Sequence, residues 1–194
     1  MENWRFPQAT IALDNGKRIL VQLRPDQAPN TVHSFIWLAN QGCFDEYPIQ
    51  RLVPGYVLDM SYSAFGQEIC KYMIANESRC QGFPNRLRMA PGMIGMGGYG
   101  PNEIAGGEFF FPLDQKTAAE KIDGRYPAFG QVLEGWEEVQ RMGQLPTEPV
   151  SVASDFELRR PVPQPVLRQV RVETFGVTYP EPVRLSVYTK PPTW

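Results

Sequence analysis

Apolar and polar residues alternate along two short segments near the N-terminus, residues 8–14 and 17–23. A two-residue period is typical of β-strands that bury one face. Asn15-Gly16 lies between the two segments and is the strongest short signal for a tight hairpin turn. We therefore expect an antiparallel hairpin here.

Two later segments carry apolar residues at helical spacing. Residues 29–41 include Val32, Phe35 and Ile36 on one expected face, begin with the cap-like run 29–31, and stop at Gly42. Glycine is the residue expected just after a helix C-terminus. Residues 134–142 predict a second helix by the same spacing.

The remaining pattern consists of short strand-like runs separated by turns. Two such runs flank Pro54-Gly55, and further short strands are expected at residues 92–100, 108–113, 126–133 and 166–175. Residues 61–91 are mixed and loop-like, five prolines predict a long loop at residues 146–165, and the tail 179–194 is expected to be extended. We expect one domain over residues 1–194, mainly β, built as a barrel or sandwich closed by helices.

Composition narrows the functional classes. The chain has 194 residues, 42% hydrophobic and 21% charged, with a net charge of −2 and no run of like charge. These values argue against nucleic-acid binding, and no apolar stretch reaches transmembrane length. Cys43, Cys70 and Cys80 show no metal-ligand spacing. We interpret them as reduced thiols of a cytoplasmic protein without a metal site.

The single histidine, His33, lies in the first expected helix. Catalytic triads and histidine-based metal sites therefore have one candidate side chain, on a helix whose pattern indicates packing. We interpret His33 as structural. The chemistry of this protein is expected to proceed without an imidazole acid or base.

The run from Gly95 to Gly100 satisfies the G-x-G-x-x-G pattern of dinucleotide-binding loops. That function requires a helix beginning at the third glycine. Pro101-Asn102 follows instead, so we expect no nucleotide cofactor. Glycines here are better explained by a close approach of another backbone segment.

Two features suggest a pocket. Arg51 places a full charge among apolar neighbours just before Pro54-Gly55, and a buried guanidinium is costly unless it is paired or used. In the run 109–111 of three phenylalanines, neighbouring side chains of a strand face opposite sides. Phe110 or one of its neighbours is therefore free to line a cavity.

Six segments in series resemble the cyclophilin family in order and approximate spacing. They are L-R-P-D-Q-A-P-N-T-V-H-S-F-I-W-L-A-N-Q-G-C-F-D, I-Q-R-L-V-P-G-Y-V-L, N-E-S-R-C-Q-G-F-P-N-R-L, G-M-I-G-M-G, G-G-E-F-F-F and I-D-G-R-Y-P-A-F-G-Q-V-L-E-G. The resemblance, to a divergent and bacterial-like member, covers about residues 8 to 142. It implies a closed eight-stranded antiparallel β-barrel capped by two α-helices, and peptidyl-prolyl cis-trans isomerase activity that needs no metal or cofactor.

The resemblance also assigns a site. Arg51 matches the family's catalytic arginine, and the family's substrate-binding positions fall on Gln50, Tyr56, Val57, Asp59, Gly97, Gly98, Glu108, Phe110, Ile122 and Tyr126. Several of these depart from the usual residues. The glutamine beside the arginine becomes Asp59, a second pocket glutamine becomes Glu108, and the tryptophan before I-D-G becomes Lys121, which predicts weak binding of cyclosporin-type ligands.

Asp59 leaves two interpretations open. Its carboxylate could direct the Arg51 guanidinium at a substrate, giving an isomerase whose partners are proline-containing peptides or unfolded protein chains. It could instead neutralise the arginine, giving a catalytically weak or inactive module that binds proline-containing peptides. The oligomeric state is left open, with a monomer favoured.

Overall fold

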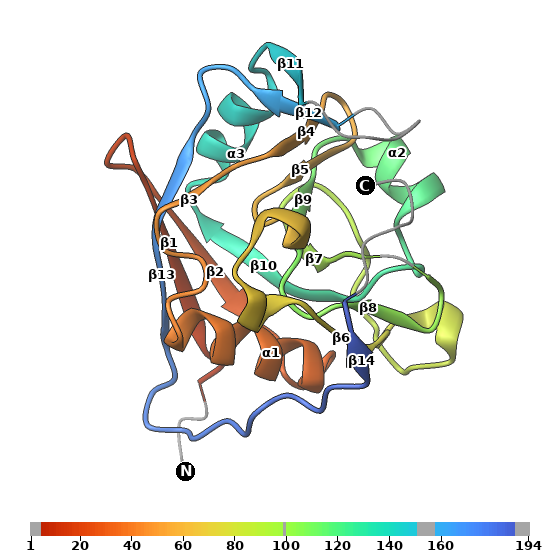
Figure 1. The fold of residues 1–194 in the computed structure, drawn as a ribbon. Coiled ribbons are helices and arrows are strands. Elements are labelled where there is room, and N and C mark those ends of the chain that lie inside the picture. The colour runs from red at the N-terminus through yellow and green to blue at the C-terminus, as the bar shows by residue number, and fades with distance from the viewer. Residues whose placement is uncertain (1–4, 99, 151–157, 189–194) are drawn as a thin grey trace.

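A nine-stranded antiparallel sheet forms the body of the protein (Figure 1). The computed structural model describes residues 5–98, 100–150 and 158–188. The strands are β1 Gln8–Leu13, β2 Arg18–Leu23, β3 Tyr47–Pro48, β4 Arg51–Val53, β5 Val57–Asp59, β7 Met93–Met96, β9 Phe109–Pro112, β10 Ala128–Glu134 and β13 Val166–Glu173. Their order across the sheet is β3-β13-β1-β2-β10-β7-β9-β5-β4. The predicted hairpin of β1 and β2 is present, with Gly16 at φ +78° in the turn.

The sheet is curled, but hydrogen bonding does not close it into the expected eight-stranded barrel. β3 and β4 are the two edge strands of the described sheet, yet only Ile49 and Gln50 separate them in the chain. The sheet must therefore curl until its edges approach one another. β3 and β4 thus correspond to one strand that is interrupted at these two residues. The interruption explains why the sheet has nine strands where eight were expected, and why it is an open half-barrel.

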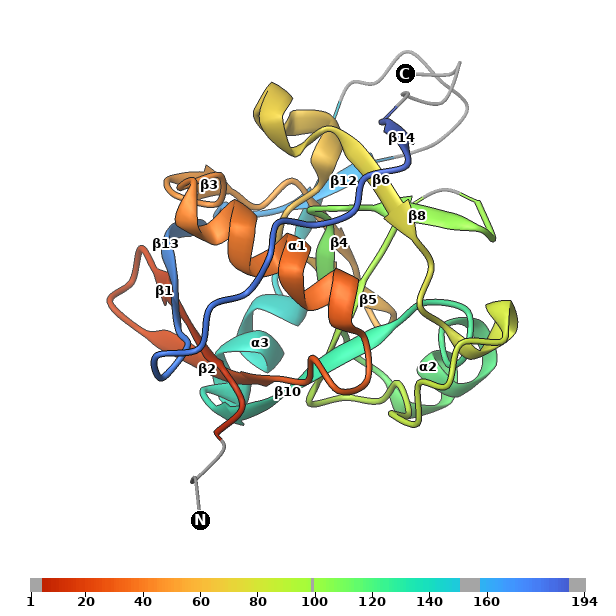
Figure 2. The ribbon, with the colours of Figure 1, turned by 90° about the horizontal axis from the view of Figure 1, so that it is seen from below.

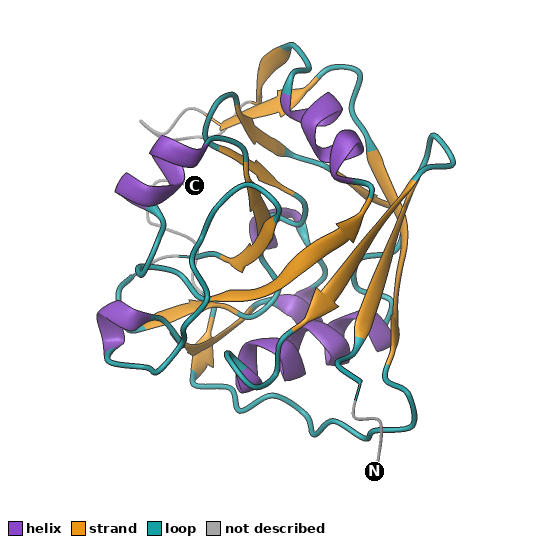
Figure 3. Cartoon of the chain, turned by 180° about the vertical axis from the view of Figure 1, so that it is seen from behind, coloured by secondary structure: helices purple, strands orange, loops and turns teal. Residues whose placement is uncertain are grey.

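Three α-helices occur in the described residues, where the sequence predicted two. α1 spans Pro29–Asn40 and α3 spans Trp136–Gly143, close to the expected ranges. Figures 1 and 3 place these two helices at opposite ends of the sheet. The missed helix is α2, Gln115–Lys121, whose seven residues are too few to show a helical period.

The first turn of α1 is capped from a distance. The run 29–31 does not provide a side-chain cap, because the N-cap is Ala28 and Pro29 opens the helix. The carboxylate of buried Glu77 instead accepts hydrogen bonds from the Asn30 N–H (3.0 Å) and the Thr31 N–H and hydroxyl (2.8 Å each). At the other end, Gly42 has φ +71°, the left-handed conformation that glycine adopts without strain.

Two segments expected to be loops contain regular structure. The proline-rich segment forms a hairpin of β11 Thr147–Val150 and β12 Leu158–Pro161, with residues 151–157 outside the described part. Prolines are tolerated there because a two-stranded sheet offers outward-facing edges. Residues 61–91 include three 3₁₀ turns, Ser63–Phe65, Glu68–Cys70 and Arg79–Gln81, and β6 Tyr72–Ala75, which pairs with β8 Glu103–Ala105.

The tail after β13 runs along the outside of α1 (Figure 2). Asn30 and Val183 exchange two hydrogen bonds, and the Arg184 guanidinium lies 4.2 Å from the Trp37 ring centroid and 4.7 Å from that of Tyr72. β14 Ser186–Val187 then pairs with β6. The expected extended tail is thus held to the body as far as the structure describes it; residues 189–194 lie outside the described part.

The core divides into a main cluster and a smaller one. Rings of Phe35, Phe44, Phe109 and Phe129 meet at centroid distances of 5.2–5.5 Å inside the curled sheet, under α1. Phe110 points the other way, as the strand alternation predicts, and joins a second buried cluster. That second cluster forms the apolar floor of the pocket described next.

Candidate active site

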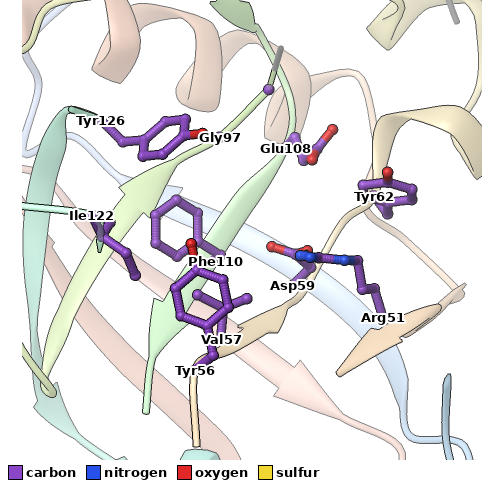
Figure 4. A pocket seen from close by; sticks show the side chains of 11 residues that line it. Arg51, Tyr56, Val57, Asp59, Tyr62, Gly97, Glu108, Phe110, Ile122 and Tyr126 are labelled. Atoms are coloured by element: carbon purple, nitrogen blue, oxygen red, sulfur yellow. The ribbon is translucent and has the colours of Figure 1, made fainter. Parts of the chain in front are cut away.

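A pocket of about 180 Å³ opens beside β4, β5 and β9 (Figure 4). Its lining consists of Arg51, Tyr56, Val57, Asp59, Tyr62, Gly97, Gly98, Glu108, Phe110, Ile122 and Tyr126. All the site residues expected from the sequence are therefore brought together except Gln50. Gln50 lies in the interruption between β3 and β4, and the described lining does not include it.

The β4–β5 hairpin places charge and apolar surface side by side. Its register pairs Arg51 with Asp59 and Val53 with Val57. Gly55 adopts φ +70° in the turn, and the Tyr56 N–H donates to the Val53 carbonyl at 3.0 Å. Because alternate residues of a strand share a face, Val57 and Asp59 both line the pocket.

The apolar end of the pocket is a small buried cluster of Val57, Met89, Phe110, Ile122 and Ala128. Phe110 is 4% exposed and meets the Tyr126 ring edge-on, with centroids 6.1 Å apart and planes at 85°. Edge-to-face packing of this kind holds aromatic rings in fixed orientations. The pocket therefore has a rigid apolar floor suited to a small saturated ring.

The polar end of the pocket is an ion pair between Arg51 and Asp59. The guanidinium Nη1 donates to the Asp59 carboxylate, and the two side chains are only 17% and 5% exposed. Burial opposes the charge of Arg51, but the attraction and hydrogen bond from Asp59 outweigh it, so the pKa of Arg51 is raised. Arg51 remains charged at all physiological pH values.

Tyr62 is the lining residue that sequence reasoning missed. Its ring centroid lies 5.9 Å from the Arg51 guanidinium carbon, and its own carbonyl accepts a hydrogen bond from the Tyr47 hydroxyl at 2.6 Å. An aromatic face at this distance attracts a cation. Tyr62 follows β5 just before a 3₁₀ turn, where neither strand nor helix periodicity predicts a side-chain direction.

Glu108 lies buried above the ion pair, on the side of Tyr62 (Figure 4). Burial and the negative charge of Asp59 raise its pKa to about 8, against the opposing influence of Arg51 and Ser63. One carboxyl oxygen, Oε2, is buried and has no hydrogen-bond partner among the described residues. Most Glu108 carboxyl groups therefore carry a proton at neutral pH.

The glycine-rich segment forms one wall by close backbone approach, as expected from the sequence. The Gly97 N–H donates to the Glu108 carbonyl at 2.7 Å, and the Gly97 carbonyl accepts from the Ala105 N–H at 2.9 Å. Gly98 has φ +141°, and a Cβ there would collide with the Ala105 backbone nitrogen. No larger residue fits at Gly98 without moving this wall.

Two features of the described residues bear on other functions. These residues contain no group of three or more His, Cys, Asp or Glu side chains placed to hold a metal ion. In the same part of the chain, no helix combines the length and the apolar character that crossing a membrane requires. Cys43, Cys70 and Cys80 are free thiols, and His33 packs near Tyr179, at a ring distance of 5.9 Å.

Known proteins with similar sequences are named peptidyl-prolyl cis-trans isomerases. An Aspergillus fumigatus protein named peptidyl-prolyl cis-trans isomerase-like 1 is 25% identical over 127 residues, which is 66% of this chain and 76% of that protein. The Arabidopsis thaliana peptidyl-prolyl cis-trans isomerase CYP57 is 28% identical over 133 residues, 66% of this chain. The chain spans only a quarter of the length of the Arabidopsis protein.

The fold is shared with solved structures. A Cryptosporidium parvum cyclophilin-type peptidyl-prolyl cis-trans isomerase, crystallised in the presence of the dipeptide Ala-Pro, superposes with a TM-score of 0.66 and 17% identity. The match covers 86% of this chain and 98% of that one. The family model described as "Cyclophilin type peptidyl-prolyl cis-trans isomerase/CLD" matches residues 9–172. With most of its length matched by that model, the chain belongs to the cyclophilin-type peptidyl-prolyl cis-trans isomerase family.

Proposed function

We propose that this protein catalyses cis-trans isomerisation of X-Pro peptide bonds and that Arg51 is its catalytic residue. The observation that carries the proposal is the sharing of one 180 Å³ pocket by a charged guanidinium and a rigid apolar floor. The guanidinium can act on the X-Pro peptide bond, and the apolar floor can hold the proline ring.

Rotation about a peptide bond is slow because amide resonance opposes it, with a barrier of roughly 18–20 kcal/mol. Twisting the bond localises a lone pair on the proline nitrogen. A guanidinium placed beside that nitrogen donates a hydrogen bond more strongly to the twisted amide than to the planar one, which is selective stabilisation of the transition state. Lowering the barrier by about 7 kcal/mol corresponds to an acceleration of about 10⁵.

The apolar floor supplies orientation. Val57, Phe110 and Ile122 are each less than 5% exposed and define a fixed site for the proline ring. Holding the ring while the preceding residue rotates confines the motion to the bond that reacts. Tyr56 and Tyr126 border the same cavity and complete its apolar rim.

The peptide backbone would lie along the glycine wall. The N–H and carbonyl of Gly97 already take part in hydrogen bonds within the fold. We therefore assign contact with the peptide chain to Gly98, which lines the pocket and whose lack of a side chain lets this segment pack against the Ala105 backbone.

The substrates we infer are proline-containing peptides and unfolded protein chains. The Ala-Pro dipeptide present with the Cryptosporidium parvum relative supports this class. We further propose that residues 1–194 act as one cyclophilin-like domain in the cytoplasm, as a monomer, and that curling brings the sheet edges together as a barrel. The free state of all three cysteines supports the compartment.

A second candidate is a module that binds proline peptides without accelerating isomerisation. The Arg51–Asp59 ion pair favours it, because a guanidinium held by a carboxylate has fewer donors for a substrate. Magnetisation-exchange NMR on an X-Pro peptide distinguishes the two functions. Faster exchange with catalytic amounts of protein supports the isomerase, whereas saturable binding with an unchanged exchange rate supports the module.

A further inference from the structure

Glu108 lines the pocket with a buried carboxyl group, one oxygen of which lacks a hydrogen-bond partner among the described residues. It immediately precedes β9, and its backbone carbonyl is fixed by the Gly97 N–H. Its side chain is 5% exposed and borders the pocket, and its Oε2 has no partner among the described residues. A buried polar atom without a partner costs free energy unless a ligand satisfies it.

The charged groups around Glu108 make a second carboxylate unfavourable. Asp59 contributes a negative charge, and the positive charge of Arg51 is already engaged by Asp59. Ser63, at the 3₁₀ turn after β5, presents the polar groups that favour ionisation. Two carboxylates beside one guanidinium would leave the pocket with a net negative charge.

Three tyrosines complete the surroundings: Tyr47 from β3, Tyr62 from the segment after β5 and Tyr126 from the segment before β10. Burial raises the pKa of the Tyr47 and Tyr126 phenols above their ordinary value. They therefore keep their protons throughout the neutral and mildly alkaline range. Glu108 is the group in this cluster whose charge changes near neutrality.

We propose that Glu108 stands in the pocket as an uncharged carboxylic acid whose hydroxyl group donates a hydrogen bond to a backbone carbonyl oxygen of the bound proline-containing peptide. The proposal rests on the isomerase site described above and adds the group that selects the peptide. Arg51 has its carboxylate partner in Asp59, and protonated Glu108 supplies a second donor in the same pocket. No bond is made or broken.

Ionisation of Glu108 removes this donor. The resulting carboxylate is a hydrogen-bond acceptor that faces the peptide carbonyl oxygen, which is also an acceptor. Affinity for a peptide without titratable groups is therefore lost as the pH rises through about 8, the pKa of Glu108. When only the protonated form binds, the Kd rises about tenfold for each pH unit above that value. Below the pKa the Kd is constant.

The test is calorimetric titration with an acetylated, amidated Ala-Ala-Pro-Ala peptide between pH 6.5 and 9.5. We expect the Kd of the wild-type protein to rise at least tenfold across this range. For Glu108→Gln, whose amide donates at every pH, we expect a flat profile, and for Glu108→Ala a flat profile with weaker binding throughout. Glu137→Gln, at an exposed site on α3, should follow the wild type.

A second readout does not depend on peptide binding. In ¹³C NMR of labelled glutamate carboxyl groups, the signal missing from Glu108→Gln should titrate near pH 8, and titration of that signal below pH 5 overturns the proposal. A flat wild-type Kd profile, or equal losses in Glu108→Gln and Glu108→Ala, also overturns it while leaving isomerase activity intact. Absence of both binding and isomerisation at every pH overturns the isomerase assignment together with this inference.

Discussion

Arg51 and Asp59 face one another directly across the β4–β5 hairpin, and their side chains form a buried ion pair in the wall of the pocket. A planar guanidinium held by a carboxylate has a fixed direction. In this protein that direction is set by strand register, because Pro54-Gly55 returns the chain so that residue 59 lies opposite residue 51. The same return brings Tyr56 and Val57 to the apolar end.

Breaking this pair is expected to destabilise the fold. Arg51→Ala and Asp59→Ala should each lower the free energy of unfolding by about 3 kcal/mol, because each leaves one buried charge without its partner. The double variant should lose less than the sum of the two. Urea unfolding of the four proteins measures the coupling, and strictly additive losses would contradict a direct interaction.

Glu77 is expected to be a main support of α1. Glu77→Ala leaves the Asn30 and Thr31 N–H groups without their acceptor, and the loss should be at least about 2 kcal/mol. Asp114→Ala is the matched control, because Asp114 caps α2 by accepting from the Thr117 N–H at a less buried site than that of Glu77. Thermal unfolding should show a larger drop in Tm for Glu77→Ala, and equal drops would refute long-range capping.

Parts of the molecule were predictable because their signals are local. The strand period placed Val57 and Asp59 on one face, and the single turn at Gly55 fixed their relation to Arg51. Phe110 separated from Phe109 and Phe111 by the same alternation. The family motifs then identified every described lining residue except Tyr62.

Other parts depend on contacts between distant residues. The cap of α1 comes from Glu77, 46 positions away from Thr31, and no local pattern announces it. The hairpin of β11 and β12 is obscured by Pro149 and Pro161, whose positions on a two-stranded edge only the pairing reveals. Helix α2 did carry a signal that was not used, the Asp114-x-x-Thr117 cap.

His33 is expected to make stability depend on pH. Burial lowers the pKa of His33 below its ordinary value of 6.5, so the unfolded chain binds the proton more tightly than the folded one. Stability should therefore fall as the pH drops below about 6.5 toward the folded pKa, and less so in His33→Gln. The lone histidine ring gives one NMR titration curve, and a midpoint above 6.5 would contradict this sign. Tyr179→Ala, which exposes the ring, should raise the midpoint toward 6.5.

Lys121 is expected to weaken the binding of cyclosporin-type ligands to this protein. Its ammonium group lies 5.6 Å from the Tyr56 ring centroid, where the family's tryptophan would present an aromatic surface. Lys121→Trp should tighten cyclosporin binding about tenfold, or ~1.4 kcal/mol. Isothermal titration calorimetry checks this, with Lys116→Trp on the exposed side of α2 as control. Tight binding by the unaltered protein would refute the role of Lys121.

The most direct test of the central assignment compares isomerisation rates of the wild type, Arg51→Ala and Arg51→Lys on one X-Pro peptide, using folded protein confirmed by circular dichroism. Arg18→Ala is the matched control, since it removes an exposed ion pair between Arg18 of β2 and Glu134 of β10. We predict that kcat/KM falls at least tenfold, or about 1.4 kcal/mol of transition-state stabilisation, in both Arg51 variants and stays unchanged in the control. Equal rates for the wild type and Arg51→Ala would contradict catalysis by Arg51.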